Sequence, residues 1–338
     1  MVHKRIVICA DGTWNDPHDA IPTNVLRVAR AVAPYDGNGV PQVVFYDWGV
    51  GSYYDPVRGG ASGVGLTKNI QDGYRFIVHN YAPGDELFLF GFSRGAYTVR
   101  ALAGMLNNCG VLRRDVAELI PRAFTLYRQH NAPPQSAVAT DWRQHHAHAG
   151  SRGEVRFLGA WDTVGALGIP TRALAFVDGQ DLFFDTQLGS NVQCARHALA
   201  IDEQRSDFAP TLWQANDAQD LKQVWFAGVH GDIGGGTRAQ HGLYLSDLAL
   251  AWMAREARRA GLALEDHLHG PLEDLHTLPP ARSHRGFYRV LGRTPRTLPA
   301  DALIHQSVAT RRAHTAYQPA ALHDCLEDGE IPAHRIER

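Results

Sequence analysis

Short apolar runs alternate with longer amphipathic stretches along most of the chain. Runs with the length and the aliphatic and aromatic content of buried strands cover residues 5–9, 42–46, 87–90, 154–159 and 223–229. Apolar residues at helical spacing predict helices over residues 24–33, 66–81, 116–129 and 246–260, and a further helix directly after residue 93. Because strands joined by helices pair in parallel and are covered on both faces, the pattern predicts an α/β fold with a mainly parallel central sheet.

The C-terminal part of the chain is less periodic. Residues 262–300 are rich in proline, histidine and arginine and show no sustained helix or strand pattern. We find no internal repeat, and a chain of 338 residues can bury one large core. We therefore expect a single domain over residues 1–338, with its core over residues 4–260 and an irregular C-terminal extension or lid-like region over residues 261–338.

Composition narrows the range of partners. A formal net charge of −2, with 20% charged residues, gives no electrostatic basis for binding nucleic acid. No apolar stretch approaches the roughly 20 residues of a spanning helix, so we expect no integral membrane segment, while peripheral membrane contact stays open. The first residues lead directly into a predicted strand, which leaves too little room for a signal peptide. We expect a cytoplasmic protein; export without a signal peptide and the oligomeric state stay open.

Cysteine and histidine spacing gives no sign of a metal. The four cysteines are scattered without a C-x-x-C pair, at Cys9, Cys109, Cys194 and Cys325. Such spacing is typical of reduced thiols rather than of a disulfide framework or a zinc site. A predicted surface excursion over residues 135–150 carries His145, His146 and His148, which we do not interpret as a metal site. The sequence therefore predicts no metal and no cofactor.

A serine lies between the strand-like run at residues 87–90 and the helix predicted after it. The sequence there is Gly91-Phe92-Ser93-Arg94-Gly95, which matches the pattern G-x-S-x-G. A serine hydroxyl acts as a nucleophile only when both a base and the substrate can reach it, and a sharp strand-to-helix turn provides that exposure. Glycine on each side removes the Cβ atoms that would collide in such a turn. The pattern predicts a nucleophile elbow with Ser93 at its tip.

Polar residues follow two other predicted strands, at the edge of a parallel sheet where ligands bind. Asp162 comes shortly after the run at 154–159, and His230 directly after the run at 223–229. The order Ser93, Asp162, His230 is the order in which α/β-hydrolases carry their catalytic triad. In this hypothesis His230 is the general base and Asp162 orients it. His305, in another short apolar run, is the alternative base.

Backbone N–H groups near the serine are candidates for an oxyanion hole. Arg94 would supply one N–H, and the loop at Gly12 and Thr13 would supply another. The Arg94 side chain either contacts substrate or braces the turn. Asp11 and Asp232 are further candidates for the substrate-binding side, although organisation of their own loops is the simpler interpretation of both.

Two other functions stay open. The stretch Cys9-Ala10-Asp11-Gly12-Thr13 is similar to the D-x-D-G-T opening of haloacid-dehalogenase-type phosphatases, but Cys9 stands where that family has its phosphoryl-accepting aspartate. A phosphatase-like hydrolase that uses the Asp11 loop is therefore the first alternative. The second alternative is a binding protein that keeps a hydrolase fold without turnover.

Sequence blocks beyond the serine pattern resemble one known family. The blocks are DGTWND, GFSRGAYTVRALAGML, WDTVGALG, RHALAIDEQRSDFAPTLW, VWFAGVHGDIGGG and LSDLALAWM. Together they resemble the uncharacterised α/β-hydrolase domain family that includes type VI secretion phospholipase effectors. The resemblance implies an α/β-hydrolase-like fold and a Ser–Asp–His hydrolase acting on a lipid or other ester, with these roles at Ser93, Asp162 and His230. We therefore expect a serine esterase or lipase, phospholipases included, that cleaves a carboxylic ester through an acyl-enzyme.

Overall fold

The structure is a computed structural model. It describes residues 3–12, 21–49, 63–129, 132–165, 187–214, 219–237, 239–240, 242–283 and 293–338. Within them, one eight-stranded sheet has the order β2-β1-β3-β4-β5-β6-β7-β8, and every neighbouring pair is parallel. The strands are β1 (Arg5–Ala10), β2 (Gln42–Asp47), β3 (Glu86–Phe92), β4 (Val155–Trp161), β5 (Cys194–Ala200), β6 (Asp220–Phe226), β7 (Leu303–His305) and β8 (Ile336–Glu337).

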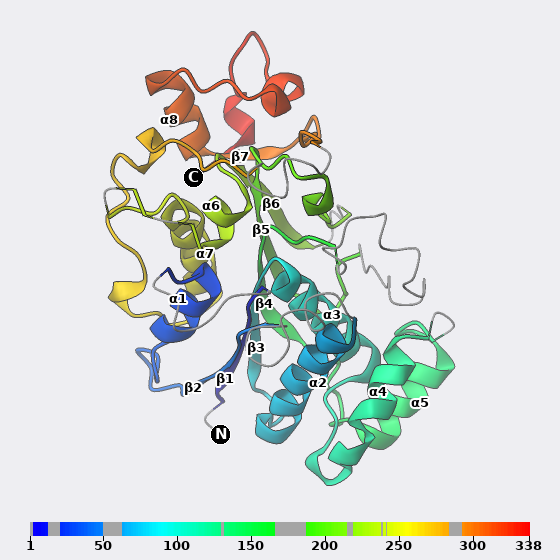
Figure 1. Cartoon of the computed structure of the whole chain (residues 1–338). Helices are drawn as coiled ribbons and strands as arrows, with labels where there is room; N and C mark the ends of the chain where they lie inside the picture. The colour runs from blue at the N-terminus through cyan, green and yellow to red at the C-terminus, as the bar shows by residue number, and fades with distance from the viewer. Residues whose placement is uncertain are drawn as a thin grey trace.

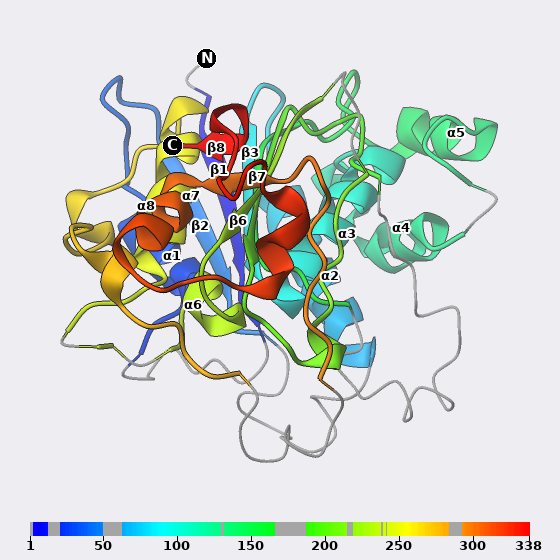
Figure 2. The ribbon, with the colours of Figure 1, turned by 90° about the horizontal axis from the view of Figure 1, so that it is seen from above.

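Helices cover both faces of this sheet. Their bounds are α1 (Asn24–Ala31), α2 (Gly63–Asn80), α3 (Arg94–Cys109), α4 (Ile120–Tyr127), α5 (Ala137–His146), α6 (His230–Gly234), α7 (Asp247–Arg259) and α8 (Gln306–His314). Figure 1 shows α2 and α3 on one side of the sheet and α1, α6 and α7 on the other, and the view in Figure 2 agrees. The predicted α/β fold with a parallel sheet between two helical layers is confirmed.

The alternation of side chains along β1 explains why both faces are apolar. Ile6 and Ile8 join a buried cluster with residues of α2 and α3, while Val7 and Cys9 join another with residues of α1 and α7. Successive strand residues point to opposite faces, so a strand covered on both sides needs a continuous apolar run. This arrangement leaves the strand ends, rather than the faces, for polar side chains.

The C-terminal part of the chain extends the sheet. β7 pairs with β6, and β8 pairs with β7, so that segments after residue 300 form one edge. A third apolar cluster joins this edge to the rest of the fold, with Trp225 of β6 packed among Ile304 and Val308. Part of the region expected as an extension or lid is therefore built into the sheet.

Several elements differ from the sequence expectation. β5 was not expected, because its sequence CARHALA places Arg196 and His197 among small residues. The helix expected over 116–129 begins as a 3-10 helix at Arg114–Leu119, which Val116 interrupts with a φ of −124° before α4 starts. The expected surface excursion contains α5, whose N-cap Ser136 accepts a hydrogen bond from the N–H of Ala139. No helix among the described residues is long and apolar enough to cross a bilayer.

Candidate active site

Ser93 stands in a strained turn between β3 and α3. Its φ of 59° and ψ of −122° lie in a region that residues with a side chain rarely adopt. A Cβ added to Gly91 would come within 2.3 Å of the Gly95 carbonyl oxygen, and one added to Gly95 within 2.0 Å of the Ala10 carbonyl oxygen. The N–H of Ser93 donates to the carbonyl oxygen of Trp161 at 3.0 Å. Strand and helix are therefore packed so closely at residues 91–95, the Ser93 turn, that only glycine fits at positions 91 and 95.

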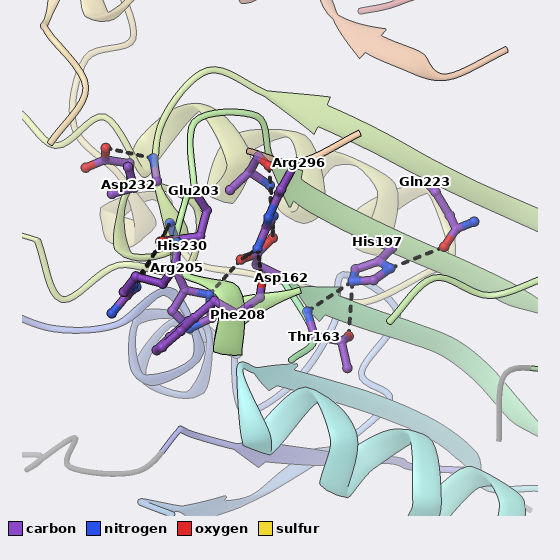
Figure 3. A network of polar contacts seen from close by, with 12 residues as sticks. Asp162, Thr163, His197, Glu203, Arg205, Phe208, Gln223, His230, Asp232 and Arg296 are labelled. Carbon is purple, nitrogen blue, oxygen red and sulfur yellow. Dashed lines mark hydrogen bonds and ion pairs between the residues drawn. The ribbon is translucent and has the colours of Figure 1, made fainter. Parts of the chain in front are cut away.

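Asp162 and His230 lie at the same end of the sheet and form a hydrogen bond. Asp162 directly follows β4, with a φ of 41°, and His230 is the first residue of α6 after β6. Nδ1 of His230 lies 2.6 Å from Oδ2 of Asp162, and both side chains are buried (Figure 3). Since an ionised carboxylate only accepts hydrogen bonds, Nδ1 carries the proton. This tautomer leaves Nε2 of His230 as the basic nitrogen.

A cation, Arg296, also binds Asp162. Its Nη1 donates to Oδ1 at 2.6 Å and its Nη2 to Oδ2 at 2.9 Å. The N–H of Ala200 donates to Oδ1 at 2.9 Å, so that each carboxylate oxygen accepts two hydrogen bonds. Burial raises the pKa of Asp162, but the charge of Arg296 and the hydrogen bonds from His230 and Arg296 outweigh it and hold that pKa well below its usual range. Asp162 is therefore an ionised, fully bonded carboxylate.

Arg296 was not predicted as a site residue. It belongs to the stretch 262–300, where arginines are frequent and no periodic pattern singles one out. Its partner Asp162 is 134 residues away in the chain, and no spacing rule connects positions that far apart. Only the fold brings the two charges together.

Aromatic rings enclose the imidazole of His230. The ring centroids of Phe92 and Phe208 lie 4.6 Å and 4.9 Å from its own, with Phe208 packed edge-on. Burial lowers the pKa of His230, the hydrogen bond and charge of Asp162 raise it, and the charge of Arg205 lowers it further, which leaves it below its ordinary value. A neutral imidazole is the form that a general base requires.

An ion pair between the buried Glu203 and the partly buried Arg205 holds the backbone beside His230. The carboxylate of Glu203 accepts two hydrogen bonds of 2.9 Å from the Arg205 guanidinium and one of 3.2 Å from the N–H of His230. The Arg205 guanidinium lies 3.4 Å from the centroid of the Phe208 ring. Glu203 thereby links the start of α6 to the segment that carries Phe208 (Figure 3). Neither residue of this pair was predicted as a site residue.

The loop after β1 is organised by Asp11. Its carboxylate accepts hydrogen bonds from the N–H of Gly12 and the hydroxyl of Tyr46, both at 2.9 Å, and from the hydroxyl of Thr23. The N–H of Gly12, a candidate oxyanion donor, is thus directed at Asp11. Thr13, the other candidate in this loop, lies outside the described residues.

The remaining predicted residues lie as follows. Asp232 accepts hydrogen bonds from the N–H groups of Val229, at 3.1 Å, and Ala281, at 2.8 Å, and so ties a C-terminal loop to α6. Arg94 is the first residue of α3, so its backbone N–H lies in the first turn of that helix. His305 caps α8 and stacks on Phe226, with ring centroids 4.4 Å apart. Asp162 is thus hydrogen-bonded to His230 rather than to His305.

The position that a phosphatase would use for its nucleophile holds a buried thiol. Cys9 is completely buried in β1, and burial together with the charge of Asp11 raises the pKa of its thiol far above the ordinary value. A protonated, inaccessible thiol cannot accept a phosphoryl group. The similarity to a phosphatase opening is therefore limited to the loop residues.

Comparison with known proteins gives four findings. The model of the family described as T6SS, Phospholipase effector Tle1-like, catalytic domain matches residues 4–256. The uncharacterized protein YEL023C of Saccharomyces cerevisiae is 27% identical over 228 residues, which cover 61% of this chain and 32% of that protein. An uncharacterized protein from Pseudomonas aeruginosa superimposes with a TM-score of 0.48 and 18% identity, over 83% of this chain and 49% of that one.

A Tle1 effector, whose structure was solved bound to the VgrG spike of the Type 6 secretion system, superimposes with a TM-score of 0.39 and 19% identity, over 72% of this chain and 53% of that one. The chain thus spans from about a third to about half the length of these relatives. The family match, however, covers most of the chain described here. This chain belongs to the family of Tle1-like phospholipase effector catalytic domains.

Proposed function

We propose that this chain is a serine hydrolase that cleaves a carboxylic ester of a lipid through an acyl-enzyme on Ser93. The observation that carries the proposal is the 2.6 Å hydrogen bond between Nδ1 of His230 and Oδ2 of Asp162, at the strand ends where the Ser93 turn also lies. The description of the family as phospholipase effectors supports a lipid as the source of the ester.

In the first half of the reaction, Nε2 of His230 takes the proton of the Ser93 hydroxyl while Oγ attacks the acyl carbon. The ester carbonyl oxygen becomes an oxyanion. Backbone N–H groups in the first turn of α3, that of Arg94 among them, and the positive end of the helix dipole stabilise this charge. The imidazolium then gives its proton to the leaving alcohol as the ester bond breaks, and the acyl group stays on Oγ.

In the second half, a water molecule replaces the alcohol. His230 takes a proton from the water, whose oxygen attacks the acyl carbon. The bond between the acyl carbon and Oγ of Ser93 then breaks, and Oγ regains its proton from the His230 imidazolium. Asp162 keeps the imidazole in the tautomer with the proton on Nδ1 and stabilises its charged form in both halves. Phe92 and Phe208 flank the imidazole, and their rings limit the access of bulk water to it.

The test compares the wild type with Ser93→Ala on p-nitrophenyl esters of increasing chain length and on phosphatidylcholine vesicles. We expect ester hydrolysis by the wild type and a loss on the order of 10⁴- to 10⁶-fold in the variant. Hydrolysis that persists in Ser93→Ala would contradict the proposal. Phosphate release that survives the change would support the phosphatase alternative. A wild type that neither turns over an ester nor reacts with a fluorophosphonate would support a binding protein.

A further inference from the structure

Arg296 lies beyond residue 256, where the family match ends, yet its side chain reaches the centre of the candidate site. Two backbone contacts fix its segment to the loop after β5. One is an isolated antiparallel β-bridge between the backbones of Arg205 and Arg293, and the other is a hydrogen bond of 2.9 Å from the N–H of Thr294 to the carbonyl oxygen of Gln204. The C-terminal part of the chain thereby inserts a charged side chain behind Asp162 (Figure 3).

The Arg296 guanidinium is almost completely desolvated. Its side chain is 3% exposed, and besides both oxygens of Asp162 it binds the carbonyl oxygens of Ala200, at 2.8 Å, and Phe208, at 2.7 Å. A buried cation is costly unless its hydrogen bonds are made, and planar guanidinium matches a carboxylate with two parallel bonds. The geometry points to a fixed orientation of the Asp162 carboxylate.

We propose that Arg296 is a positioning residue, which aims the Asp162 carboxylate at Nδ1 of His230 and keeps the imidazole neutral at lower pH than a simple Asp–His pair would. This inference rests on the proposed function. In a pair without the arginine, the whole carboxylate charge would favour the imidazolium. Here Arg296 already neutralises part of that charge, and it disfavours a second positive charge nearby.

Other charges also face His230, and all of them remain when Arg296 is replaced. Glu203 accepts a hydrogen bond from the N–H of His230. Arg205, which like Glu203 belongs to the segment after β5, forms an ion pair with Glu203. Asp232 lies on the same helix as His230, and its carboxylate accepts hydrogen bonds from the N–H groups of Val229 and Ala281. A shift in the acidic limb of the pH profile can therefore be assigned to Arg296 by changing that residue alone.

The test uses Arg296→Met, which removes the charge, and Arg296→Lys, which keeps it but cannot make two parallel bonds. The control is Arg196→Met. Arg196, like Arg296, is a buried arginine bound to carboxylates, in its case Asp220 and Glu256, but it lies near the opposite end of β5. The readouts are kcat/KM against pH for a p-nitrophenyl ester and the rate of Ser93 labelling by a fluorophosphonate against pH.

We expect the acidic limb of both profiles to move up by about one pH unit in Arg296→Met and to stay in place in Arg296→Lys and Arg196→Met. We expect Arg296→Lys to lower kcat about tenfold or more at unchanged KM, because the carboxylate is no longer held. If the acidic limb of Arg296→Met lies at the same pH as that of the wild type, the proposal is overturned. If that variant does not fold, a wild-type kcat in Arg296→Lys overturns it instead.

The same set of proteins separates this inference from the proposed function. If Ser93→Ala keeps its activity, or the wild type is not labelled at Ser93, the proposed function itself fails and the inference fails with it. If Ser93→Ala is inactive while the Arg296 variants behave as the wild type does, the hydrolase stands and only the positioning role is wrong.

Discussion

The backbone N–H of Ser93 donates a hydrogen bond of 3.0 Å to the carbonyl oxygen of Trp161, the residue before Asp162. The bond continues the parallel pairing of β3 with β4, in which Phe92 lies opposite Trp161. The next strand repeats the arrangement, because the N–H of Asp162 donates to the carbonyl oxygen of Ala198 in β5 at 2.8 Å. Strand register thus brings the serine turn and the aspartate to neighbouring positions at one edge of the sheet.

The two candidate bases can be separated by mutation. His230→Ala removes the group bonded to Asp162, and we expect kcat to fall on the order of 10⁴- to 10⁶-fold. His305→Ala removes a ring that stacks on Phe226 and caps α8, so ester hydrolysis by the folded variant should stay within a few-fold of the wild type. Steady-state kinetics on one p-nitrophenyl ester measures both. The reverse result would identify His305 as the base.

The pair of Asp162 and Arg296 predicts a non-additive effect on stability. Asp162→Asn leaves the buried guanidinium without its counter-charge, and we expect a cost of about 3–5 kcal/mol in the free energy of unfolding. The double variant Asp162→Asn/Arg296→Met removes both charges, and it should regain much of that stability while remaining inactive. Urea denaturation of the two single variants and the double variant gives the coupling energy. Strictly additive losses would show that the pair is not buried as described.

Much of the site was predictable from local pattern, because its elements are continuous in sequence. Ser93 and Asp162 directly follow apolar strands, and His230 comes four residues after the end of β6; a parallel sheet collects such strand ends at one edge. The local sequence does not determine which of the polar residues at strand ends takes part in catalysis. Asp11 also follows a strand, but its hydrogen bonds with Tyr46 and Thr23 show it holding a loop.

The missed features depend on pairing between distant residues. β5 carries Arg196 and His197, which look unsuited to a buried strand, but Arg196 binds Asp220 and Glu256, and His197 lies within hydrogen-bonding distance of Thr163 and Gln223. Arg296 is a case of the same kind, since its partner Asp162 is remote in sequence. A buried charge is acceptable once it is paired, and the pairing exists only in the folded chain.

The close approach at the Ser93 turn predicts that its glycines are indispensable. In Gly95→Ala the new Cβ would lie 2.0 Å from the Ala10 carbonyl oxygen, a backbone atom of strand β1. We expect a loss of about 3 kcal/mol or more in the free energy of unfolding, together with the loss of activity. Gly37→Ala is the matched control, because nothing lies within 4 Å of its added Cβ. Urea denaturation compares the two, and equal stabilities would contradict the described packing.

His197 predicts a pH dependence of stability. Burial lowers its pKa to about 3, with a smaller contribution from the charge of Arg100, whereas an unfolded histidine titrates at about 6.5. Because the folded pKa is depressed, the unfolded chain binds a proton between these values that the folded chain does not. The stability contribution is therefore complete above pH 6.5 and is lost as the pH falls toward the folded pKa.

The corresponding measurement is urea denaturation of the wild type and His197→Gln at pH 7 and pH 5. Below pH 6.5 the wild type should lose stability faster than the variant, by up to about 1.4 kcal/mol per pH unit. The variant itself loses some stability at both pH values, because Thr163 changes its partner. The difference between the two pH values is the diagnostic quantity, and parallel losses in both proteins would show that His197 titrates normally in the folded chain.

The most direct test of the central claim is to trap the acyl-enzyme. The wild type is mixed with a p-nitrophenyl ester, quenched in acid during the first turnovers, digested and analysed by mass spectrometry. We predict that the mass of the acyl group is added to the peptide containing Ser93, and that neither Ser93→Ala nor His230→Ala accumulates this adduct. Release of p-nitrophenol by a wild type that carries the acyl group on another residue, or on none during a burst, would contradict the assignment of Ser93 as the nucleophile.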